Sequence, residues 1–115
     1  MMTWVYDPHR GGVKITPEKR EQICKQVDSY ARTRPWYPKI QLKVRFKGQL
    51  CYIDTVASGD ERQLPLCRLR YFNLEELSLA FFTFSNDTYQ ACNFRGGKQT
   101  GTITSALELC EPFII

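Results

Sequence analysis

The chain has 115 residues, of which 43% are hydrophobic and 24% charged, a composition typical of one globular domain with a buried core. The net charge is +4, and no stretch approaches the roughly 20 apolar residues of a membrane-spanning helix. We therefore expect a single α+β domain over residues 1–115 that is soluble, cytoplasmic and free of membrane contact.

The five cysteines are widely spaced and odd in number, which argues against a disulfide framework and favours a reducing compartment. A zinc site usually has closely paired ligands such as Cys-x-x-Cys, and His9 is the only histidine. The cysteine pattern therefore predicts free thiols, no structural metal and no cofactor.

The first expected elements are a short strand or ordered arm over residues 3–6 and a helix over residues 17–32. Thr16, Pro17 and Glu18 supply an N-cap, a proline at the first helical position and an acid in the first turn. Apolar residues then recur at helical spacing, as expected of a helix that packs one side on a core.

Residues 39–47 carry the clearest pattern in the chain, because apolar and polar side chains alternate strictly along them. Such alternation predicts a half-buried strand. Its polar side holds four cations, Lys39, Lys43, Arg45 and Lys47. Two prolines stiffen the connection before it, which contains Trp36 and Tyr37.

Four further strands are expected at hairpin-length spacing, over residues 50–56, 64–72, 77–84 and 88–94. The run 77–84 is nearly all apolar, which is typical of a strand covered on both faces. Residues 73–76 fit either a hairpin loop or a helical turn.

The segment from Ser105 to Glu108 resembles a capping box, which predicts a short final helix closed off by Pro112. The order of elements favours an α+β fold: a curved antiparallel sheet of about five strands, with the N-terminal helix packed on one face and a short C-terminal helix. The apolar end, residues 113–115, is expected to dock on the body or on a partner subunit.

A cationic sheet face is the first candidate site, because residues 39–70 carry seven cations against three acids. If Arg68 and Arg70 lay beside the lysines of the first long strand, the combined patch would contact several phosphates. Trp36 and Tyr37 would add base stacking. The predicted binding residues are Lys39, Lys43, Arg45, Lys47, Arg68, Arg70, Trp36 and Tyr37. The competing interpretation is a solvated strand face whose lysines prevent edge-to-edge pairing.

His9, flanked by Asp7 and Arg10, is a candidate for general acid–base chemistry because a histidine titrates near neutrality. The same residues also fit a plain turn.

Asp54 ends an apolar run and is a candidate metal ligand, although no paired carboxylate supports it. The simpler interpretation has Asp54 capping a turn or pairing with Arg68 or Arg70.

The aromatic residues from Tyr71 to Phe94 alternate along the expected strands. We interpret them as core and cross-strand packing rather than as the lining of a ligand cavity.

Four segments also give the chain a family resemblance: residues 3–12, 45–54, 66–72 and 78–86. In these segments the chain resembles a family of small uncharacterised bacterial proteins that has no assigned activity. The resemblance implies a bacterial cytosolic protein and assigns no site residue.

Three functions remain open. The leading hypothesis is a non-catalytic binding or interaction module whose partner is a protein or a nucleic acid. The second is a small basic, metal-independent ribonuclease resembling RelE-type toxins, in which basic and tyrosine side chains stabilise phosphate charge. The third is a structural homo-oligomer built through a strand edge or the apolar C-terminus.

Overall fold

The computed structural model describes residues 11–60 and 62–114 of the chain. Its elements in chain order are α1 (Pro17–Arg32), β1 (Ile40–Lys47), β2 (Leu50–Ala57), β3 (Gln63–Asn73), β4 (Glu76–Thr83), β5 (Thr88–Cys92), the 3-10 turn η1 (Arg95–Gly97) and α2 (Ile103–Ile114). The arm expected over residues 3–6 and the candidate residues Asp7, His9 and Arg10 lie outside the described residues.

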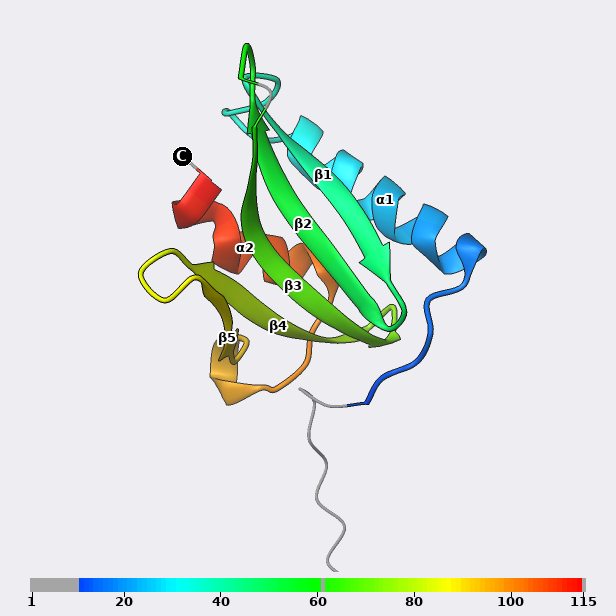
Figure 1. Ribbon diagram of the computed structural model, residues 1–115. Coiled ribbons are helices and arrows are strands. Elements are labelled where there is room, and N and C mark those ends of the chain that lie inside the picture. The colour runs from blue at the N-terminus through cyan, green and yellow to red at the C-terminus, as the bar shows by residue number, and fades with distance from the viewer. Residues whose placement is uncertain (1–10, 61, 115) are drawn as a thin grey trace, which may run out of the picture.

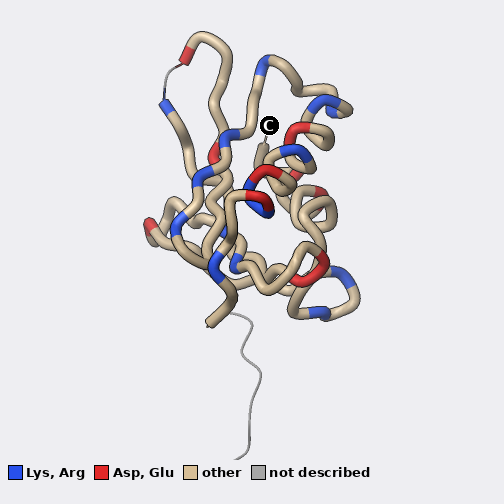
Figure 2. The backbone as a smooth tube through the Cα atoms, turned by 90° about the vertical axis from the view of Figure 1, so that its right-hand side faces the viewer, with Lys and Arg blue, Asp and Glu red and all other residues tan. Residues whose placement is uncertain are grey.

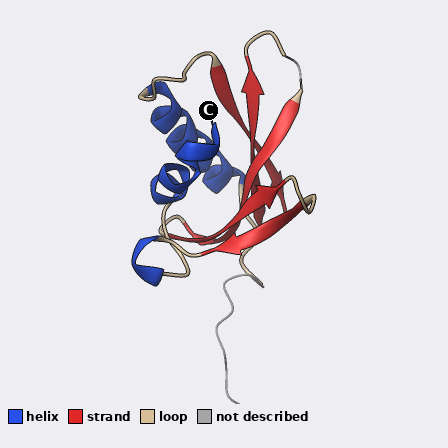
Figure 3. Ribbon diagram, turned by 90° about the vertical axis from the view of Figure 1, so that its left-hand side faces the viewer, coloured by secondary structure: helices blue, strands red, loops and turns tan. Residues whose placement is uncertain are grey.

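The five strands form one antiparallel sheet in the order β1-β2-β3-β4-β5, so every strand pairs with its neighbours in sequence. The sheet is curved and open, and both helices lie on the same side of it (Figures 1 and 3). The predicted α+β class is therefore confirmed. We call the side that carries the helices the inner face and the opposite side the outer face.

Helix α1 begins and ends where the sequence predicted, at Pro17 and Arg32. Thr16 is its N-cap, and the Thr16 hydroxyl accepts the backbone N–H of Lys19 at 3.4 Å. The stripe of Ile23, Val27 and Ala31 is buried against the inner face. The apolar residues at helical spacing are therefore the side of α1 that packs on the core, as predicted.

The β1–β2 hairpin has a two-residue turn, since Lys47 pairs with Leu50. Gly48 takes a φ of 59° there, a backbone conformation that glycine adopts without strain. The segment before α1 is bound to this turn and to β3 (Gln63–Asn73), because the Ile15 N–H donates to the Gly48 carbonyl at 3.1 Å and the Val13 N–H donates to the Tyr71 carbonyl of β3 at 2.8 Å. Ile15 is consequently fully buried.

Helix α2 differs from its prediction at both ends. It begins at Ile103 rather than near Ser105, because Thr102 supplies the N-terminal cap by accepting the backbone N–H of Ser105 at 3.1 Å. Pro112 lies inside the helix rather than closing it. A proline in the last turn forfeits only one helical hydrogen bond, and Ile114, two residues later, is buried in the core. Ile114 therefore docks on the body of the domain.

The inner face and the two helices enclose one core. Strands β2, β3 and β4 each contribute fully buried side chains, and both helices cover them. Among the largest are Ile53, Leu69 and Leu79 from the sheet, Ile23 from α1 and Leu107 from α2. The ambiguous residues 73–76 form the tight turn and start of β4 in the β3–β4 hairpin, not a helix.

Candidate functional site

The strand register aligns the predicted cations of β1 and β3 on the outer face. Arg45 pairs with Tyr52, which pairs with Arg68, and Lys47 pairs with Leu50, which pairs with Arg70. Residues in such a cross-strand row point to the same side of a sheet. Figure 2 shows Lys and Arg positions following one another along the strands. The two arginines of β3 therefore lie on the same face as the cations of β1.

Arg45 is held by a carboxylate from the neighbouring strand. Its Nε and Nη2 atoms donate to the two Asp54 oxygens at 2.6 and 3.1 Å, and the Gln63 amide donates to the same carboxylate at 3.2 Å. The hydrogen bond to Asp54 is the main cause that raises the pKa of Arg45. Asp54 is nearly buried, with a side chain only 4% exposed, whereas Arg45 is 51% exposed.

This arrangement corrects the interpretation of Asp54. The residue lies within β2 rather than at its end, and its partner is Arg45, not Arg68 or Arg70. The reason is the antiparallel register, which sets Asp54 opposite Lys43 and diagonal to Arg45. No group of three potential ligands among His, Cys, Asp and Glu gathers as a metal site within residues 11–60 and 62–114.

Tyrosine rings lie between the arginines of the outer face. The Arg45 guanidinium lies 4.8 Å from the centroid of the Tyr52 ring, and the Arg68 guanidinium lies 5.2 Å from that of Tyr89. The two tyrosine rings meet edge-on, with centroids 5.6 Å apart. Burial, followed by the negative charge of Asp54, raises the pKa of Tyr89. Cations and rings thus form one continuous array from β1 to β5.

Two phenylalanines extend this array toward the β4–β5 turn. Phe82 pairs with Tyr89 across the strands, and their rings meet edge-on at 5.1 Å. Phe84, directly after β4, meets Phe82 edge-on at 4.9 Å and is 64% exposed. The expectation that residues 77–84 are covered on both faces therefore holds only for the first part of the run. From Phe81 onward the side chains are partly or largely exposed.

The remaining cations differ in how firmly they are held. Arg70 donates to the Gly11 carbonyl at 2.8 Å. Lys43 and Lys47 are exposed, and Lys39 lies exposed just before β1. In the part of the chain that the structure describes, these three lysines have no ion-pair partner. They are the cations most available to an anionic ligand.

Trp36 and Tyr37 do not belong to this face, which corrects their predicted role in stacking. Trp36 is only 6% exposed, and its indole N–H donates to Glu111 of α2 at 2.7 Å. Tyr37 packs against the core and lines a cavity with Val27 and Leu42 on the inner side. Both rings lie on the helix side of the sheet, because burying their apolar surface against the core is favourable.

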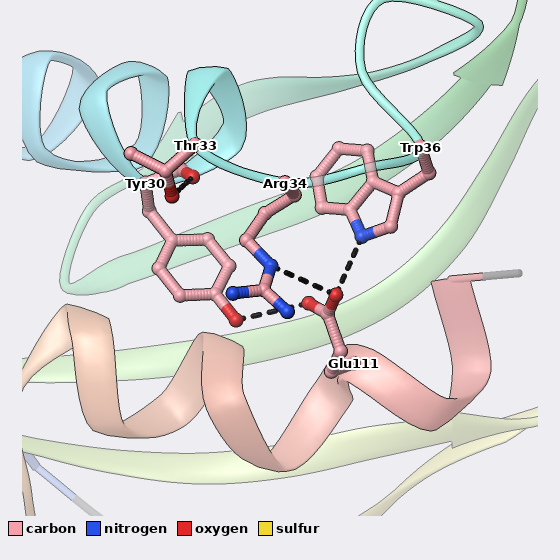
Figure 4. A network of polar contacts seen from close by, with 5 residues as sticks. All are labelled: Tyr30, Thr33, Arg34, Trp36 and Glu111. Atoms are coloured by element: carbon pink, nitrogen blue, oxygen red, sulfur yellow. Dashed lines mark hydrogen bonds and ion pairs between the residues drawn. The ribbon is translucent and has the colours of Figure 1, made fainter.

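Glu111 is the centre of a polar network between the two helices (Figure 4). It accepts hydrogen bonds from the Tyr30 hydroxyl at 2.9 Å, from Arg34 Nε at 3.0 Å and from Trp36. Burial alone would raise the pKa of Glu111, but these three donors together lower it. Glu111 thereby connects α2 to Tyr30 of α1 and to Arg34 and Trp36 of the connection before β1.

The sequence pointed to the cations of the outer face but missed its aromatic members, Tyr52, Phe82, Phe84 and Tyr89. Leu50, Tyr52 and Asp54 are two residues apart along β2, so all three point to the same face of the sheet. The two-residue repeat of the strand could therefore have predicted that Tyr52 shares a face with Asp54. The contact between Tyr52 and Tyr89 joins strands β2 and β5, which have two other strands between them, so it depends on the curvature of the sheet (Figure 1) and not on any local pattern.

Comparisons of the chain with protein-family models, with curated proteins and with solved structures found no match. Among the described residues, no helix is both long enough and apolar enough to cross a membrane.

Proposed function

We propose that this protein is a non-catalytic binding module that holds an anionic partner on the outer face of its sheet. The observation that carries the proposal is the alignment of five strand cations on that face, Lys43, Arg45, Lys47, Arg68 and Arg70. Both helices lie on the other side, so no described helix covers these side chains.

The division of the cations into held and exposed groups fits a binding surface. Arg45 and Arg68 lie on tyrosine rings, and a guanidinium held in this way loses little further freedom on binding. The exposed Lys43 and Lys47 supply charge that attracts a polyanion over a longer distance.

The same surface is poorly suited to proton transfer. Its arginines stay charged at all ordinary pH values, and the raised pKa of Tyr89 keeps that phenol protonated. A general base would need a pKa near the working pH. These properties favour binding over the ribonuclease alternative.

The proposed setting is the cytoplasm of a bacterium, in line with the family resemblance. Five cysteines without a disulfide among them suit a reducing compartment.

The test measures binding of nucleic-acid-free protein to labelled polyanions by fluorescence anisotropy across a salt series. The panel contains a single-stranded RNA, a duplex DNA, a sulfated polysaccharide and polyglutamate. We expect salt-sensitive binding to at least one nucleic acid or polysaccharide. The double variant Lys43→Gln/Lys47→Gln should make the negative slope of log K against log salt for a single strand less steep by about 1.4, since each lost phosphate contact contributes about 0.7 to its magnitude.

The matched control is Lys25→Gln/Lys98→Gln, which removes the same charge from other surfaces. Lys25 lies on α1, where its ammonium meets Glu21, and Lys98 lines a cavity beside α2. The control should bind like the wild type. Absence of binding at low salt, or equal losses in both double variants, would reject the proposal. Cleavage of the RNA would reject its non-catalytic part.

A further inference from the structure

We infer that the ligand of the outer face is single-stranded nucleic acid, with Phe84 as a platform on which a base stacks. This inference rests on the proposed function, because it names the ligand class of the same surface. The inference adds stacking of a nucleic-acid base on an aromatic ring to the ionic contacts between phosphates and cations.

The first step of the argument is the exposure of Phe84. A phenylalanine that is 64% exposed leaves a large apolar surface in water. Among residues 11–60 and 62–114, the Phe84 ring meets one other aromatic ring, that of Phe82, and meets it edge-on, so at least one face of the Phe84 ring is not covered by an aromatic neighbour there. An uncovered ring face is what an unpaired base stacks on.

The second step is the support beneath Phe84. Phe82 contacts both Phe84 and Tyr89 through edge-on ring contacts, at 4.9 and 5.1 Å. Tyr89 is held in turn by Arg68. The platform is therefore attached to the sheet through a series of rings, rather than standing alone on a turn, and it costs little ordering on binding.

The third step is the continuity between rings and charge. Arg68 touches Tyr89, and Arg45 touches Tyr52, so the cations that would contact phosphates adjoin the rings that would contact bases. A single strand presents both groups at once, because its bases are not paired. A duplex hides its bases in the stack and offers the face its phosphates alone.

The carboxylates of an acidic polypeptide would pair with the cations but would not stack on the rings. Carboxylates pair with lysine and arginine, whereas a base also has a π-face that stacks on phenylalanine or on an arginine plane. The combination of alternating arginines and rings therefore favours nucleic acid over an acidic polypeptide.

The experiment compares four probes, each across the same salt series: a mixed-sequence RNA strand of about 10 nucleotides, the same strand in a duplex, an abasic strand of equal length, and polyglutamate. The abasic strand keeps the phosphates and lacks the bases. We expect the wild type to bind the base-containing strand most tightly. Phe84→Leu should weaken that binding about fivefold or more, leave the abasic strand unaffected and keep the salt slope unchanged.

Phe113→Leu is the matched control, because Phe113 is also 64% exposed but lies on α2, where its ring meets Phe81. Thermal melts check that both variants fold. If the abasic strand or the duplex binds as tightly as the base-containing strand and Phe84→Leu changes nothing, the inference fails while the proposed function stands. Tightest binding of polyglutamate rejects the inference in favour of an acidic protein. Binding of none of the probes rejects both proposals.

Discussion

Trp36 and Glu111 are joined by a hydrogen bond of 2.7 Å that runs from the indole N–H to a carboxylate oxygen. It links the connection before β1 to the C-terminal helix, across 75 positions of sequence. Because Tyr30 and Arg34 donate to the same carboxylate, one side chain of α2 satisfies three donors from the other end of the chain. Glu111 is thereby the main polar contact between α2 and the N-terminal helix region.

Glu111→Gln should lower the free energy of unfolding near neutral pH by about 1–2 kcal/mol, a modest value for a charged acceptor because Arg34 is partly exposed. The folded-state pKa of Glu111 lies below the usual 4.5, so its stabilisation is present above pH 4.5 and is lost as the pH falls through the folded value. Urea unfolding of both proteins should therefore converge in acid. Glu108→Gln, at an exposed position of the same helix, is the control and should behave as wild type.

Tyr30 should titrate far above an ordinary phenol. Burial, followed by the hydrogen bond to Glu111, raises its pKa to about 12 from the usual 10. The stability that the protonated hydroxyl contributes is fully present below pH 10 and is lost as the pH rises through about 12. The difference in phenolate absorbance between wild type and Tyr30→Phe isolates this titration. A midpoint near 10 would contradict the hydrogen-bonded geometry.

Removal of Arg45 should destabilise the domain more than removal of its partner. Arg45→Gln leaves the nearly buried Asp54 carboxylate without its two guanidinium donors, whereas Asp54→Asn leaves a half-exposed cation that water can solvate. We expect about 1–3 kcal/mol for Arg45→Gln, a smaller loss for Asp54→Asn, and partial recovery in the double variant. Equal losses in the two single variants would show that the burial of Asp54 is unimportant. This coupling is also why the binding test uses lysines.

Gly12→Ala should be more costly than Gly11→Ala. Both glycines have positive φ, at 98° and 73°, so alanine strains either position by about 1–2 kcal/mol. At Gly12 an added Cβ would also lie 2.9 Å from the Tyr71 carbonyl oxygen and 3.1 Å from Arg70 Cγ, whereas at Gly11 it meets nothing within 4 Å. Thermal unfolding of the two variants measures the difference. Equal melting temperatures would mean that the segment moves away from β3 freely.

The cysteines should divide into two classes toward an alkylating reagent. Cys51, Cys67 and Cys110 are fully buried, and burial raises the pKa of Cys51 to about 12. The hydrogen bond to Cys110, together with burial, raises the pKa of Cys67. Since the thiolate is the reactive form, these thiols should react only after unfolding. Cys24, exposed on α1, should be modified in the native protein, as mass spectrometry of the peptides would reveal. Rapid labelling of Cys67 without denaturant would contradict the packing.

The local elements could be predicted from sequence because each follows from interactions between residues close in the chain. Thr16 and Pro17 start α1 wherever the helix docks, and the alternation of residues 39–47 depends only on the two-residue repeat of a strand. The consecutive hairpins then favour an antiparallel sheet, which the structure confirms. The start of α2 was misplaced because Thr102 and Ser105 are both good caps, and local sequence does not choose between them.

Sequence alone therefore established the set of elements and the alternation that puts the cations of residues 39–47 on one side of a strand, since both depend on periodicity and on contacts within one hairpin. The tertiary structure decided which charges and rings share that face. Register across β2 placed Arg68 in the same cross-strand row as Arg45, and the curvature of the sheet brought Tyr52 to Tyr89. Core packing placed Trp36 against Glu111. These pairings join residues far apart in the chain, where the geometry depends on how all strands and helices pack together and not on any local pattern.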